Sequence, residues 1–345
     1  MRKTAAKLLT VAALATSLAT VASGTALADP ASLPAAQDIV GVGSDTTQAL
    51  LNQFSTDYNA TVAGTTAPRL YSWDATGTSP ITTKTGATSI ARPNGSGAGI
   101  TALNTNTSAT VDFARSSRGP AATDPTTDDF IAYAKDAVSW AALGTGGHAP
   151  ANLTTANLKD IYTCAVTKWN QIDPSLSSAT IKPQLPQASS GTRSFFLQAI
   201  GGGTAVTPGA CVTTGVQENQ GSDPVLNDAD ILVPYSVAHY IGQVYFGKGS
   251  GSDVQGPLTI RSVNGIAPVD TVNKVISSSY AATAYGRVVY NVVRHAEWIA
   301  TDTHGTALRA IFGPTGWICK SGSADIKSYG FLPLPSFACG SATHS

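Results

Sequence analysis

Short β-type segments and amphipathic helical segments alternate along most of the chain, separated by runs rich in Gly, Ser and Thr. The apolar run at 38–42 is typical of a buried strand, and the apolar positions within 47–58 recur at helical spacing. The same patterns predict strands at 69–73, 111–114, 137–143 and 287–293, and helices at 153–162 and 305–312. This alternation predicts an α/β fold, in which ligands bind at the carboxyl ends of the strands.

Three runs of small polar residues stand directly before helical stretches. In the clearest, at 189–193, Ser-Ser-Gly-Thr-Arg precedes an apolar helix that we expect to end at Gly201. The runs at 43–47 and 94–99 have the same design. A helix N-terminus offers unpaired N–H groups and the positive end of the helix dipole, and it therefore holds anions. Capped helices without a ligand are common, but three such runs favour a binding site formed by Ser44, Asp45, Thr46, Gly95, Ser96, Gly97, Ser190, Gly191, Thr192 and Arg193.

A fourth candidate segment lies at 112–118, where a predicted strand ends in the sequence Arg-Ser-Ser-Arg. Guanidinium groups bind oxyanions through paired hydrogen bonds, so Arg115, Ser117 and Arg118 are candidate ligands at the mouth of a sheet. The alternative is a loop that carries two surface arginines.

The N-terminal 28 residues have the pattern of a signal peptide. Arg2, Lys3 and Lys7 precede an apolar, Ala-rich stretch, and Ala26-Leu27-Ala28 is a small-residue cleavage site. We expect residues 1–28 to be removed, 29–36 to form a flexible start, and the protein to be secreted, periplasmic or at the cell surface. No Cys follows the cleavage site, so no lipid anchor is expected, and no later apolar run approaches the ~20 residues of a membrane span.

Net charge and chain length limit the classes of function and the number of lobes that the chain can have. The chain has 21 basic and 21 acidic residues; cleavage would remove three basic residues, which leaves 18 against 21 and a net charge of −3. That balance excludes a strongly basic nucleic-acid-binding surface, so an anion would be held by local hydrogen bonds and a few arginines. After cleavage 317 residues remain (345 minus 28), a length at which two lobes are the default.

Sequence signals for catalysis are weak. The run at 242–249 approximates a nucleotide-binding loop but lacks Ser or Thr after Lys248. The chain has no Gly-x-Ser-x-Gly or His-Glu-x-x-His motif, and its five histidines show no metal-ligand spacing. We therefore expect no enzyme activity, no cofactor and no metal, and a secreted phosphatase-like hydrolase is the less favoured alternative.

Taken in order, several stretches resemble those of the extracellular phosphate-binding proteins of ABC importers, over most of 38–245. They are 42–47 (the first Gly-rich anion loop), 94–100 (Ser-Gly-x-Gly-Ile), 111–117 (Asp-Phe-x-x-Ser-Asp), 153–172 (a helix-and-Trp signature) and 190–192 (Ser-Gly-Thr).

The resemblance implies a type II periplasmic-binding-protein fold, with mixed sheets flanked by helices and a ligand cleft between two lobes. Lobe one would comprise 37–134 and 285–345, and lobe two 135–284, with crossings near Tyr133 and Ala284. The resemblance also implies a monomer that passes its ligand to an ABC permease and contacts a membrane only through that permease. The ligand would be phosphate or a similar tetrahedral oxyanion, bound by Thr46, Ser96, Ser190, Gly191 and Thr192. A binding fold turned to another ligand, or to cell-surface interaction, is the alternative.

Two positions depart from the family pattern. The family carboxylate that accepts the proton of hydrogen phosphate, and so rejects sulfate, is replaced by Ser117. The Arg that commonly stands shortly before Ser-Gly-Thr is replaced by Pro186. Our hypotheses are that Arg115, Arg118 or Arg193 supplies the guanidinium and that Asp45 supplies the carboxylate.

Four cysteines, all beyond the cleavage site, predict two disulfides in an oxidising compartment. Each lobe that the resemblance implies contains two of them, which pairs Cys164 with Cys211 and Cys319 with Cys339. The alternative is a metal site, for which the cysteine spacing is wrong.

Overall fold

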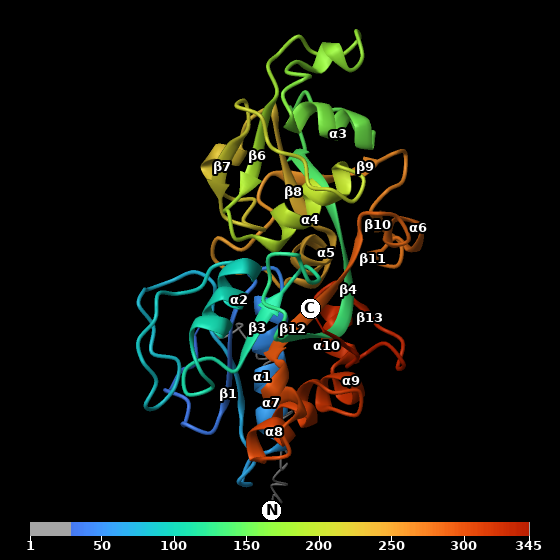
Figure 1. The fold of residues 1–345 in the computed structure, drawn as a ribbon. Coiled ribbons are helices and arrows are strands. Elements are labelled where there is room, and N and C mark those ends of the chain that lie inside the picture. The colour runs from blue at the N-terminus through green and yellow to red at the C-terminus, as the bar shows by residue number, and fades with distance from the viewer. Residues whose placement is uncertain (1–28, 345) are drawn as a thin grey trace, which may run out of the picture.

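In the computed structural model, which describes residues 29–344, the chain forms two lobes that lie one above the other in Figure 1. The expected signal peptide, 1–28, lies outside the described residues. This arrangement confirms the predicted two-lobed α/β fold, whereas the residue boundaries of the lobes stay a prediction. None of the helices among the described residues is both long and apolar enough to span a membrane.

Lobe one, the lower lobe in Figure 1, contains the first strands and the C-terminal helices. Its elements are β1 (Ile39–Gly43), α1 (Gln48–Thr61), β2 (Leu70–Ser72), α2 (Ser96–Thr105), β3 (Phe113–Ser116), α7 (His295–Ile299), α8 (Thr303–Phe312), α9 (Trp317–Ser321), α10 (Ser323–Ser328), β13 (Leu332–Pro333) and β14 (Ala342–His344).

Lobe two, above it, contains the middle of the chain. Its elements are β5 (Asn152–Leu153), α3 (Thr155–Tyr162), β6 (Lys182–Pro186), α4 (Gly191–Ile200), β7 (Thr213–Val216), β8 (Ile231–Ser236), α5 (Val237–Phe246), β9 (Leu258–Val263), β10 (Val269–Asp270), β11 (Val275–Ile276) and α6 (Ser278–Ala281), with 3-10 turns at Trp169–Gln171 and Pro224–Leu226.

One sheet continues through both lobes, because β4 (Asp128–Leu143) and β12 (Gly286–Arg294) run between them. Within the described residues its main strand order is β2-β1-β3-β12-β4-β8-β6-β7. Strand β1 is parallel to β2 and β3, and β12 is antiparallel to both β3 and β4. Strand β4 pairs with β12 up to Ala137 and with β8 from Val138 onward. The two lobes therefore share a continuous backbone ladder at the point where they meet.

Two of the predicted helices begin at the N-terminal capping residues that the sequence indicates. The side chain of Thr154 accepts a hydrogen bond from the Asn157 N–H at the start of α3, and Ser190 accepts one from the Arg193 N–H at the start of α4. Gly201 follows α4 as its C-terminal cap. Helix α2 begins at Ser96, so residues 96–99 of the predicted loop at 94–99 form the first turn of the helix.

Each lobe contains one disulfide in addition to its apolar core. Cys164–Cys211 joins the end of α3 to the segment before β7, and Cys319–Cys339 joins α9 to the C-terminal segment. These bonds confirm the predicted pairing. In lobe two the rings of Tyr162 and Phe196 pack edge to face with centroids 5.0 Å apart, which fixes α3 against α4.

A carboxyl pair where α1 meets α10 makes stability depend on pH. Burial, together with the charge and hydrogen bond of Asp57, raises the pKa of Asp325 from 3.8 to about 6. Between these values the folded chain holds a proton that the unfolded chain has lost, so stability falls as the pH rises through that window. We expect Asp325→Asn to raise the free energy of unfolding by about 1 kcal/mol at pH 7.5, allowing for solvent screening, and to change it little at pH 4. Denaturant titrations at both pH values measure this, and an equal effect at both would contradict it.

Candidate functional site

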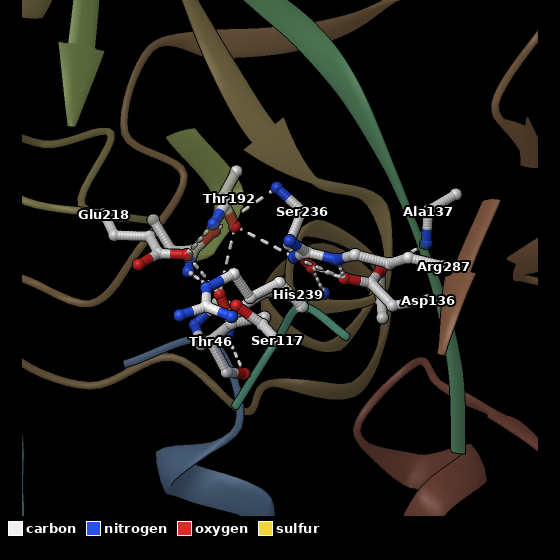
Figure 2. A network of polar contacts seen from close by, with 12 residues as sticks. Thr46, Ser117, Asp136, Ala137, Thr192, Glu218, Ser236, His239 and Arg287 are labelled. Carbon is white, nitrogen blue, oxygen red and sulfur yellow. Dashed lines mark hydrogen bonds and ion pairs between the residues drawn. The ribbon is translucent and has the colours of Figure 1, made fainter. Parts of the chain in front are cut away.

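The loops that the sequence predicts to bind an anion meet between the two lobes. Thr46 follows β1 and Thr192 lies in the first turn of α4; their Oγ1 atoms are 3.2 Å apart (Figure 2). The Oγ atoms of Ser96 and Ser117 are 3.3 Å apart, and the Ser117 N–H donates to Ser96 Oγ at 3.0 Å. All four side chains are buried. The hydroxyl groups of two loops and two helix starts thus gather in a single cluster, which we call the anion cradle.

Glycines allow the two lobes to approach this closely. A Cβ atom on Gly191 would lie 2.3 Å from Ser96 Oγ and 2.4 Å from Ser117 Oγ. Gly95 has a φ angle of +100°, and a Cβ atom there would lie 2.4 Å from the carbonyl oxygen of Ser189 in lobe two. The neighbouring Gly97 N–H donates to that same carbonyl at 3.0 Å. Side chains at Gly95 or Gly191 would therefore press on the opposite lobe.

Neutral side chains supply further bonds between the lobes. The amide of Asn94 in lobe one exchanges hydrogen bonds with Gln187 and Gln217 of lobe two, at 2.8 and 2.9 Å. Asn219 Nδ2 donates to Thr46 Oγ1 at 3.2 Å. The contacts at the cleft are thus mostly between uncharged donors and acceptors.

A carboxylate that sequence reasoning missed, Glu218, reaches the cradle from the loop after β7. Its side chain is 1% exposed, and Oε1 accepts hydrogen bonds from Thr46 Oγ1 at 2.5 Å and from the Thr192 N–H at 3.3 Å. Its Oε2 atom is buried and has no hydrogen-bond partner among the described residues. The signal in the sequence is the polar run at 217–220 after a short β-type segment, which lacks the Gly and Ser of the other loops.

An arginine that was also missed, Arg287 of β12, reaches Thr192 from the side opposite to Glu218 (Figure 2). Its Nη2 donates to Thr192 Oγ1 at 2.9 Å, and Nε and Nη2 both donate to Asp136 Oδ2, at 3.0 and 2.7 Å. Its Nη1 atom is buried without a hydrogen-bond partner among the described residues, and the guanidinium lies 5.6 Å from the centroid of the Phe195 ring. A buried cation thus stands beside the start of α4.

Asp136 of β4 holds this guanidinium in place. Besides Arg287, its carboxylate accepts hydrogen bonds from Ser236 Oγ at 2.9 Å and from the N–H groups of Ala137 and Ala238 at 2.6 and 2.9 Å. A buried ion pair resists disruption when its remaining lone pairs are satisfied in this way. The position of Arg287 is therefore fixed by both crossing strands.

Comparison with known proteins identifies the family of the chain. A family model described as "PBP superfamily domain" matches residues 20–280. The chain belongs to the PBP superfamily. A search of curated proteins found no match.

Solved structures similar to this PBP chain include an ABC-type phosphate transport receptor from Vibrio cholerae, at 17% identity and a TM-score of 0.56, covering 86% of this chain and 100% of that one. Another is a putative phosphate ABC transporter substrate-binding protein with bound phosphate from Clostridium perfringens, at 13% identity and a TM-score of 0.57, covering 86% and 100%. A third is a phosphate-binding protein from Stenotrophomonas maltophilia, at 12% identity and a TM-score of 0.54, covering 87% and 91%. These likenesses show the two-lobed fold.

The arginines that the sequence offered as anion ligands make contacts within the protein, and their role as ligands stays a prediction. Arg115 is fully buried, where its guanidinium donates to Ser72 Oγ and to three backbone carbonyls, and burial lowers its pKa to about 10. Arg118 forms an ion pair with Asp124 at 2.6 Å, and Arg193 Nη1 donates to the Pro186 carbonyl at 3.0 Å. Arg115 lies within β3 and fastens it to the neighbouring strands, rather than facing the cleft.

Asp45 and Ser44 also lie beside the cradle rather than in it. Asp45 Oδ2 accepts a hydrogen bond from Gln217 Nε2 at 2.5 Å. The Asp45 residue also lines a cavity of about 200 Å³, together with Asp253 and Lys248. Burial, with the nearby charges of Asp253 and Glu218, raises the pKa of Asp45 to about 8. The Ser44 carbonyl accepts from Arg115. The carboxylate that touches the cradle is therefore Glu218.

His239 of α5 fixes the loop after β1. Its Nδ1 lies 3.1 Å from the carbonyl oxygen of Thr46, and its Nε2 lies 2.6 Å from Asp253 Oδ1. Burial alone would lower the pKa of His239, but the charges of Asp253 and Asp45 outweigh burial and raise it to about 9. The imidazolium therefore carries both ring protons at neutral pH and donates one of them to the Thr46 carbonyl.

The close approach at Gly95 predicts the effect of adding one methyl group. In Gly95→Ala the new Cβ would meet a backbone atom of lobe two, so we expect the lobes to separate and the radius of gyration to rise in X-ray scattering. The matched control is Gly203→Ala: its φ is +104° and nothing lies within 4 Å, so it carries backbone strain without the contact. Both variants should lose about 1–3 kcal/mol of stability. An unchanged radius in Gly95→Ala would contradict the prediction.

Proposed function

We propose that this chain is an exported, non-catalytic solute-binding protein that captures phosphate, or a tetrahedral oxyanion like it, between its lobes for an ABC permease. The observation that carries the proposal is the cradle: buried hydroxyls of Thr46, Ser96, Ser117 and Thr192 and the guanidinium of Arg287 converge on the start of α4. The phosphate-binding descriptions of similar structures support it.

The cradle residues have the chemistry that a tetrahedral oxyanion requires. In the closed lobes the hydroxyl of Thr46 bonds to that of Thr192 across the cleft, and the hydroxyls of Ser96 and Ser117 bond to each other within lobe one. An anion that enters between opened lobes would take over these donors. The Thr192 N–H and the Arg287 Nη1 atom add donors from the helix start and from β12. Hydrogen bonds to an ionised acceptor are about twice as strong as neutral ones, so the exchange favours binding. Capture and closure then need no bond-breaking step.

The two departures from the family pattern have replacements in this proposal. Arg287 takes the role of the missing arginine at Pro186, and Glu218 takes the role of the missing carboxylate at Ser117. The unpartnered Oε2 atom of Glu218 would accept the proton of hydrogen phosphate. Sulfate carries no proton at neutral pH, so its oxygens would face the carboxylate without a hydrogen bond between them.

Export and delivery complete the proposal. The N-terminal signal-peptide pattern supports release from the cytoplasm, and the two disulfides suit an oxidising compartment. We propose that the protein acts as a monomer and meets a membrane only through its permease.

Calorimetric titration of the chain from Asp29 to Ser345, stripped of ligand by unfolding and dialysis, tests the binding step. We expect phosphate to bind at pH 7 and sulfate to bind far more weakly. Arg287→Gln should weaken phosphate binding by about 10- to 100-fold, because a charged donor is lost. Arg193→Gln, an arginine outside the cradle, is the matched control and should bind as the wild type does. If neither anion binds to folded protein, the cleft serves another ligand.

Exchanging the carboxylate tests how the site tells the two anions apart. In Glu218→Gln the amide can donate to sulfate, so we expect the ratio of phosphate to sulfate affinity to fall by about 10-fold or more. Asp45→Asn is the matched control and should leave that ratio unchanged. The reverse result, a fall in Asp45→Asn alone, would place the selecting carboxylate at Asp45.

A further inference from the structure

Three potential metal ligands gather where the C-terminal strand β14 pairs with the first residues of β4. Asp129 of β4 is buried, with Oδ2 2.8 Å from His295 Nδ1 and Oδ1 3.0 Å from His344 Nδ1. The three ligand atoms all lie within 4.8 Å of one another, and the imidazole rings have centroids 4.5 Å apart. Within the described residues this is the only group of three or more His, Cys, Asp or Glu side chains placed to hold a metal ion.

The backbone holds the three residues together from both edges of β4. On one edge Val293 of β12 pairs with Asp129, and His295 follows two residues later with its N–H bonded to the Thr127 carbonyl at 2.8 Å. On the other edge His344 of β14 pairs directly with Asp129. Residues opposite each other in neighbouring strands have Cβ atoms about 5 Å apart, so this placement follows from strand register rather than from flexible side chains.

We propose that Asp129, His295 and His344 bind a divalent transition-metal ion of the Zn²⁺ type, which ties the C-terminal strand β14 to β4. Imidazole nitrogens and carboxylate oxygens bind Zn²⁺ at about 2.0–2.2 Å, so ligand atoms about 3.3 Å apart surround one ion. The present spacing needs only small side-chain rotations to reach that geometry. Each imidazole would offer the lone pair of Nδ1 to the ion and carry its ring proton on Nε2.

Exposure and charge also suit an ion at this position. The side chains of His295 and His344 are 43% and 52% exposed, so an ion has a path from solvent, and water can fill its fourth position. Arg294, which precedes His295 in the sequence, is already paired with Glu297 at 3.0 Å. The sequence predicted no metal because the three ligands are separated by 166 and 49 positions and show no local motif.

The site is separate from the anion cradle. Asp129 and Asp136 lie seven residues apart on β4, which is ~23 Å of extended strand. Failure of one proposal therefore leaves the other untouched, and variants of the metal site should bind phosphate as the wild type does.

Calorimetric titration of the chelator-treated chain with ZnCl₂, in phosphate-free buffer at pH 7.5, tests the proposal. We expect one Zn²⁺ ion per chain and no binding of Mg²⁺, which prefers oxygen ligands. His295→Ala and His344→Ala should each weaken binding about 10-fold or more. The matched control is His148→Ala, because His148 also bonds to a carboxylate, Asp230 at 2.9 Å, but has no second imidazole beside it.

Thermal unfolding gives a second readout. Zn²⁺ should raise the Tm of the wild type and of His148→Ala, and should raise the Tm of His344→Ala much less at the same Zn²⁺ concentration. Absence of Zn²⁺ binding to the folded wild type would overturn the proposal. So would binding that survives in the His295→Ala, His344→Ala double variant, because the ion would then lie elsewhere.

Discussion

The buried ion pair between Asp136 and Arg287 is the interaction on which the cleft depends. The two residues lie opposite each other on the strands that connect the lobes. Through Asp136 the pair also holds Ser236 and the first turn of α5, and through Arg287 it holds Thr192 of α4. Removing either partner would leave an uncompensated charge in the interior, at a cost of about 3–5 kcal/mol. Thr192 and Ser236 therefore take their positions from this one pair.

The charges around the cradle restrict what can bind there. The positive charge of Arg287 is already balanced by Asp136, while Glu218 adds a carboxylate that contacts only neutral groups. An anion thus meets donors of favourable geometry but no net positive charge. If the cleft binds hydrogen phosphate as proposed, a proton between the anion and Glu218 would remove the remaining repulsion, and the protonation state of the ligand would be part of its recognition.

Local signals in the sequence identified the parts of the site that depend on local structure. The starts of α2 and α4 and the loop after β1 were predictable, because a helix N-terminus is encoded within about four residues. Glu218 and Arg287 were not, since each reaches Thr192 from a distant segment. The burial of Arg115 was not predictable for the same reason: whether a strand-end arginine faces solvent or the neighbouring strands depends on the sheet around it.

The length of β4 shows how tertiary contacts override the hydrophobic pattern. Only 137–143 was predicted as a strand, yet the strand begins at Asp128, with buried carboxylates at Asp128, Asp129 and Asp136. Each carboxylate has its own partner: Asn104 for Asp128, His295 and His344 for Asp129, and Arg287 for Asp136. These partners lie far away in sequence, so the charges look unfavourable for a buried strand until the sheet is assembled.

If the lobes open to admit a ligand as proposed, Arg287 can keep its position, because the contacts that must break differ from those that hold it. Many of the contacts between the lobes at the cradle are neutral, such as Thr46 with Thr192 and Asn94 with Gln217. Exchanging such bonds for bonds to water costs about 0.5–1.5 kcal/mol each. Asp136 and Arg287, by contrast, lie on adjacent strands of one ladder, so their pairing is expected to persist when the loops separate. Arg287 would then be in position before an anion arrives, which reduces the reorganisation that binding requires.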